Sequence, residues 1–150
     1  MYITKYALDK IQAYTKHATG EVSGIAKFEQ IGDTFGITDA VIVDQIATAA
    51  TVDAPAAGIA NFFQNNPKES PANWVVQWHS HANMATYFSQ TDVENILENK
   101  NIDTKISIVV NKKKENKVRW DFFKNNLHYL TVDDSLQLIE ESNEELDKLC

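Results

Sequence analysis

Two of the four histidines in this 150-residue chain stand one residue apart, as His79 and His81 in the segment QWHSHANMATYFSQTD. Residues i and i+2 of a β-strand project from the same face, so both imidazoles could reach one metal ion at about 2.0–2.1 Å. Asp92 follows at the start of an expected helix, where its carboxylate can turn back toward the strand end. Three such ligands leave a fourth position for water, which is typical of catalytic rather than structural zinc.

Each part of this motif also has a simpler interpretation. Ser89 and Asp92 make an S-x-x-D pattern, which alone is an acidic variant of the capping box at a helix start. An isolated H-x-H pair belongs more often to packed or surface strand residues than to a metal site. The two interpretations are compatible at Ser89, whose backbone can start the helix while its hydroxyl faces the site. The metal hypothesis therefore depends on the joint spacing of the histidines, the serine and the aspartate.

The histidines end a predicted strand over residues 73–81. Its alternation places Trp74, Val76, Trp78 and Ser80 on one face and Val75, Gln77, His79 and His81 on the other. Hydrophobic spacing and turn residues predict the remaining elements. These are a helix over 5–18 with Thr4 as N-cap and Gly20 as a stop, a hairpin of 21–30 and 34–43, helices over 56–66 and 90–100, strands over 104–111, 117–123 and 127–132, and a last helix from about Asp133.

This order, α-β-β-α-β-α-β-β-β-α, predicts an α/β (α+β) fold in which a mixed central β-sheet is flanked by helices. A chain of this length suits one domain over residues 1–150. The net charge of −7 argues against a nucleic-acid partner, because proteins that bind the phosphate backbone carry a basic face. We find no run of 18 apolar residues and no signal-peptide core, and the single cysteine, Cys150, forms no internal disulfide. We therefore expect no membrane partner and a cytoplasmic location.

The full spacing resembles that of a known family. His79, Ser80 and His81, then Ser89 and Asp92, match the signature H-[ST]-H-x7-S-x2-D of the JAMM (MPN+, JAB-domain) zinc metalloproteases. The short connections around the motif resemble the compact prokaryotic or phage members. The resemblance implies the JAB/MPN fold, whose layout is related to that of cytidine deaminases.

The family signature also includes a glutamate on an early strand. The segment GEVSGIAKF resembles that part of the family, which makes Glu21 the matching residue and Glu29 the nearby alternative. We prefer Glu21 because it directly precedes the matching small-residue pattern, whereas Glu29 adjoins a predicted turn. One departure is Phe88, which stands where the family often has proline.

The resemblance implies one Zn²⁺ per chain, held by His79, His81 and Asp92, that activates water for amide hydrolysis. Glu21 would carry the proton to the leaving amine, and Ser89 would donate to the oxyanion. The implied substrate is the C-terminal tail of a ubiquitin-like protein or a similar extended tail, cut by a zinc isopeptidase or peptidase.

Other functions stay open. One is a non-catalytic MPN-type scaffold, although inactive relatives lose ligands and all five positions are present here. Another is a general zinc peptidase unrelated to ubiquitin-like proteins. A zinc-dependent nucleoside deaminase is set aside, because it needs a P-C-x-x-C pair that this chain lacks.

Overall fold

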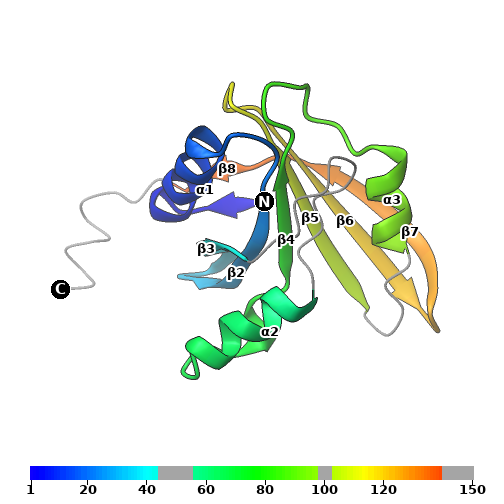
Figure 1. Ribbon diagram of the computed structural model, residues 1–150. Coiled ribbons are helices and arrows are strands. Elements are labelled where there is room, and N and C mark those ends of the chain that lie inside the picture. Colours follow the sequence, from blue (N-terminus) through cyan, green and yellow to red (C-terminus); the bar gives the residue numbers. More distant parts are fainter. Residues whose placement is uncertain (44–55, 98–102, 140–150) are drawn as a thin grey trace.

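The computed structural model describes residues 1–43, 56–97 and 103–139 of the chain. Helices and strands follow in the order β1 (Tyr2–Ile3), α1 (Lys5–His17), β2 (Ser23–Ile31), β3 (Thr34–Ile42), α2 (Ala56–Asn65), the 3₁₀ turn η1 (Pro71–Asn73), β4 (Val76–Ser80), α3 (Gln90–Leu97), β5 (Thr104–Val110), β6 (Asn116–Lys124), β7 (Leu127–Asp134) and β8 (Gln137–Leu138). The strands form one mixed sheet, and α1 and α3 lie on either side of it (Figure 1). The expected class, a mixed sheet flanked by helices, is confirmed.

The strand order in the sheet is β7-β6-β5-β4-β2-β3-β1-β8. The histidine strand β4 lies near its centre, antiparallel to β2 and parallel to β5. The hairpins β2–β3, β5–β6 and β6–β7 are antiparallel, whereas β1 pairs in parallel with β3 and with β8. The two-residue strands β1 and β8 are not apparent from the sequence, because strands this short have no hydrophobic periodicity.

Helix α1 covers one face of the sheet. It begins as predicted at Thr4, whose hydroxyl oxygen accepts a hydrogen bond from the backbone N–H of Ala7 at 3.2 Å. Its apolar stripe is fully buried in the main core: Ala7 and Ile11 pack with Ala26, Ile37, Val76, Trp78 and Ile108. Burying each large aliphatic side chain of this kind contributes about 1.5–3 kcal/mol, so this cluster anchors the strand that carries the histidines.

Close contact between β2 and β4 depends on a glycine. Gly24 pairs with Trp78, and a Cβ added to Gly24 would lie 2.0 Å from the carbonyl oxygen of Val41 and 2.7 Å from the indole nitrogen of Trp78. Any larger residue would clash with the β3 backbone and with the Trp78 indole. The glycine therefore leaves room for this side chain of the histidine strand against β2.

Trp74 does not lie on the face predicted for it, because it packs in a second apolar cluster. Trp74 packs with Ile25, Val43 and Phe62 under α2, and not with Trp78 in the main core. The alternation does not reach back to Trp74, because β4 begins only at Val76, after η1. The Trp74 indole N–H instead donates to Glu69 at 2.9 Å.

The helix predicted from Asp133 is wrong at its start. Strand β7 continues to Asp134, which pairs with Val118, and β8 follows it and pairs with β1. The helical spacing of Leu136 and Ile139 is therefore overridden by backbone pairing with distant strands. Residues 140–150, the rest of that predicted helix, lie outside the described residues, as do residues 98–102 after α3.

No helix in the described part of the chain is both long and apolar enough to cross a membrane.

Candidate metal centre

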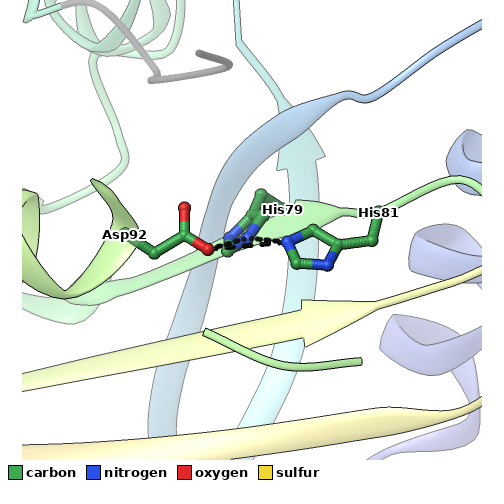
Figure 2. A group of neighbouring side chains, drawn as sticks. All are labelled: His79, His81 and Asp92. Atoms are coloured by element: carbon green, nitrogen blue, oxygen red, sulfur yellow. Dashed lines mark hydrogen bonds and ion pairs between the residues drawn. The ribbon is translucent and has the colours of Figure 1, made fainter. Parts of the chain in front are cut away.

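The predicted alternation along β4 sets the direction of both histidines. Trp78 and Ser80 are buried on the α1 face, whereas Gln77 is exposed on the other. His79 and His81 project with Gln77, and Asp92 in the first turn of α3 reaches them from above that face (Figure 2). His81 is only 4% exposed, so the centre lies at the edge of the core.

The three donor atoms form a nearly regular triangle. The Nε2 atoms of His79 and His81 are 3.0 Å apart, and Oδ2 of Asp92 lies 3.3 Å and 3.5 Å from them, respectively. Bonds of 2.0–2.1 Å in a tetrahedral zinc site place neighbouring ligand atoms about 3.3–3.4 Å apart. The residues present therefore fit a zinc ion with one open position.

The tautomer of His81 leaves its Nε2 atom as an acceptor that faces the His79 ring. Its Nδ1 lies 3.0 Å from the carbonyl oxygen of Ala85, which can only accept, so Nδ1 carries the proton. The Nε2 atom of His81 then presents a lone pair toward His79. Two such lone pairs repel at 3.0 Å unless a proton or a metal ion lies between them. This outer hydrogen bond is of the kind that orients histidine ligands in metal sites.

The capping-box interpretation of Ser89 and Asp92 is confirmed. The backbone N–H of Ser89 donates to Oδ2 of Asp92 at 2.9 Å, and the N–H of Asp92 donates to Oγ of Ser89 at 3.1 Å. This is a reciprocal capping box. The same carboxylate oxygen faces the histidines, so the cap also fixes the third candidate ligand. The Ser89 hydroxyl accepts within the cap and keeps its own proton free to donate.

Asp92 is held as a carboxylate. Burial opposes its ionisation, but hydrogen bonding to His79 and to the backbone of Ser89 outweighs burial and keeps the pKa of Asp92 well below its ordinary value. An ionised carboxylate at neutral pH is the form that binds a metal ion.

The loop after β4 is fixed by a residue that the motif does not include. Asn111, 3% exposed at the end of β5, donates through Nδ2 to the carbonyl oxygen of Met84 at 3.0 Å. The N–H of Lys112 donates to the carbonyl of Ala82 at 2.7 Å, where the backbone has φ 53°, a conformation rare outside glycine. These contacts hold the loop whose Ala85 carbonyl orients His81. The only signal in the sequence is a polar residue directly after an apolar strand.

The structure separates the two candidate glutamates. Ser23 pairs with His79, and the carbonyl of Val22 accepts from the N–H of Ser80 at 2.7 Å, so Glu21 lies beside the end of the histidine strand. Glu29 lies six residues beyond Ser23 along β2, about 20 Å from it, where the Glu29 carboxylate accepts from the hydroxyl of Thr38. Among the described residues, the group of possible metal ligands does not include Glu21.

The fold and site thus define an α+β protein with a cluster of three possible metal ligands beside a central strand. No family model matches the chain, and no curated protein matches it. Among solved structures, the chain is similar to the solution structure of protein DSY2949 from Desulfitobacterium hafniense. The TM-score is 0.60 and the identity 12%, over 95% of this chain and 95% of that one. At this identity the likeness shows the fold alone.

Proposed function

We propose that this chain is a JAMM-type zinc metallopeptidase that hydrolyses the amide bond after the C-terminal tail of a ubiquitin-like protein. The observation that carries the proposal is the triangle of donor atoms formed by His79, His81 and Asp92, whose edges match a tetrahedral zinc site. Two imidazoles and one carboxylate suit zinc, and three protein ligands are typical of catalytic sites. When bound, zinc would supply a Lewis acid that polarises the scissile carbonyl and makes hydroxide available near neutral pH.

The neighbouring residues have distinct tasks in this proposal. Ser89 keeps a hydroxyl proton at the edge of the centre and would donate it as a hydrogen bond to the oxygen that becomes negative during attack. Glu21, beside the end of β4, would take the proton from the attacking water and pass it to the leaving amine. The buried carbonyl contact at His81 keeps its ring in the ligating tautomer.

Two observations support an extended protein tail as the substrate. The donors lie where a strand ends, and a large side chain next to the cut would crowd them, so glycine is favoured there. In addition, Met84 and Tyr87 on the adjoining loop are 50% and 47% exposed, which offers apolar surface to an incoming protein. The Tyr87 ring lies 5.0 Å from that of His81, so this surface borders the centre.

The proposal is tested with ubiquitin-like proteins that end in Gly-Gly and are fused to a second protein. The zinc-loaded chain should cut after the glycines, chelation should abolish cutting, and fusions carrying Val-Val should resist. Equal cutting of both versions would refute the preference for small residues. Failure to cut any such fusion would leave a general zinc peptidase as the better hypothesis.

A further inference from the structure

A cavity of about 50 Å³ opens beside the metal centre, between α3 and the sheet. His79 and Asp92 form part of its wall, so a group bound there would lie next to the reacting bond. A water-sized group needs about 10–15 Å³ on this measure, so the cavity has room for roughly three to five such groups. That space suits a small side chain and excludes a large one.

One wall residue has an unmet hydrogen-bonding requirement. Ser107 lies in β5 between Ile106 and Ile108 and is 5% exposed. Its Oγ atom has no hydrogen-bond partner among the described residues. Buried hydroxyls are nearly always paired, and an unpaired one is destabilising. A buried serine between two isoleucines is therefore accounted for if a ligand supplies the missing partner.

The strand register places this hydroxyl close to the centre. Ser107 pairs directly with Gln77 on β4, and the next residues on the same face are His79 and Val109, which also pair. One same-face step along a strand is about 6–7 Å, the reach of a single residue. Gln77 and Asn95 add amide groups to the wall, and Lys105 adds a buried cationic side chain farther along β5. The lining is thus polar as well as small.

We infer that this cavity binds the side chain of the first residue on the leaving side of the cut and selects a small hydroxyl-bearing residue such as serine. The inference rests on the proposed function, in which the residue before the cut is glycine and has no side chain to enter the cavity. The occupant must then come from the leaving group. A lysine joined through its ε-amine would bring methylenes against Ser107 and leave the hydroxyl unpaired. The preferred substrate is therefore a linear fusion rather than a lysine conjugate.

Cleavage of matched fusion substrates tests whether the cavity selects serine after the cut. Substrates that differ only in the residue after Gly-Gly, either serine, alanine or leucine, should differ in kcat/KM, with serine about tenfold or more above alanine. A lysine-linked conjugate should be cut more slowly than the serine fusion. Ser107→Ala should bring the serine-to-alanine ratio close to one. Thr15→Val is the matched control: it removes a buried hydroxyl on α1, across the sheet from the cavity, and should keep the ratio of the unaltered chain.

Binding provides a readout that does not depend on hydrolysis. Serine amide, titrated into ¹⁵N-labelled protein with and without zinc, should shift the amide resonances of Ser107, Gln77 and Asn95 more than alanine amide does. Selective binding without any cleavage would retain the cavity assignment and overturn the proposed hydrolase. Cleavage with equal rates for serine and alanine, or serine binding that Ser107→Ala leaves unchanged, would overturn the cavity assignment alone. Absence of both binding and cleavage would overturn both.

Discussion

The side-chain amide of Asn111 holds the carbonyl oxygen of Met84 at 3.0 Å and thereby joins the end of β5 to the loop that orients His81. The same side chain accepts from the backbone N–H groups of Lys113 and Glu115, both at 3.0 Å. Asn111 thus fixes two loops at once. Any effect of Asn111 on the candidate metal centre would pass through the Ala85 carbonyl, next to Met84, which contacts the His81 ring.

Asn111→Ala should weaken zinc affinity about 10–100-fold, the usual effect of losing an outer hydrogen-bond partner in a metal site. Asn111→Asp keeps the acceptor oxygen for both backbone groups but cannot donate to Met84, so it should weaken binding as well. Competition with a chromophoric chelator measures the affinity. Unchanged affinity in both variants would show that the loop holds His81 without this contact.

Purified protein should contain about one zinc per chain, and His79→Ala, His81→Ala and Asp92→Asn should each lose most of it, because three ligands hold the ion. His17→Ala is the matched control, since His17 is exposed at the end of α1. Elemental analysis gives the ratio. Full zinc content in both the His79 and the His81 variant would contradict the assignment, and a ratio near two would contradict a single-zinc site.

The two roles of Ser89 can be separated by comparing alanine with glycine. Ser89→Ala should cost about 1 kcal/mol of unfolding free energy through loss of the helix cap, whereas Ser89→Gly should cost only a few tenths. Both remove the hydroxyl, so both should lower turnover about 10²–10³-fold if Ser89 is an oxyanion donor. Urea unfolding and steady-state kinetics provide the two measurements. Turnover that follows stability instead would assign the serine to the cap alone.

Glu21→Gln should retain zinc and fold yet lose nearly all hydrolysis, because it removes a proton carrier and no ligand. Glu29→Gln is the internal control, since that carboxylate is bound to Thr38 near the β2–β3 turn. Zinc content, circular dichroism and kcat are measured on both. Loss of activity in the Glu29 variant alone would identify Glu29, and not Glu21, as the proton carrier.

The depressed pKa of Asp92 makes a pH-dependent contribution to stability in the zinc-free protein. A carboxylate whose pKa is lowered on folding stabilises the fold above its unfolded pKa of about 3.9, and this contribution is lost as the pH falls toward the folded value. Asp92→Asn keeps one oxygen to accept from Ser89 but carries no charge. The difference in unfolding free energy between the two proteins should therefore be larger at pH 7 than at pH 3. An equal difference at pH 7 and at pH 3 would contradict the lowered pKa of Asp92.

Local patterns in the sequence predict those elements whose side chains alternate between core and solvent. The face of β4 that carries His79 is of this kind. Local capping residues likewise predict the helix starts at Thr4 and Ser89. The segment after Asp133 is not, because its backbone pairing with Val118 and with β1 involves partners distant in sequence. Local helical spacing cannot reveal such pairing.

The candidate site likewise combines residues that local sequence patterns predict with residues whose role depends on distant pairing. The three candidate metal ligands are within one short motif, and their type and spacing predict that they lie together, as the structure shows. Asn111 and Ser107 act through a carbonyl and a cavity that exist only after β5 has paired beside β4. Their roles become visible only with the tertiary structure.

The three proposed ligands all fall within residues 79–92. A short segment closes into a loop at a low entropic cost, so the unfolded chain already offers a usable chelating peptide. A ligand that binds only the folded state adds about 2.7 kcal/mol to the unfolding free energy at 100 times its dissociation constant, and any affinity for the unfolded chain reduces that gain. Zinc should therefore raise the unfolding midpoint less than its affinity for the folded protein implies. For the same reason, a nascent chain could capture its metal before β5 has been synthesised.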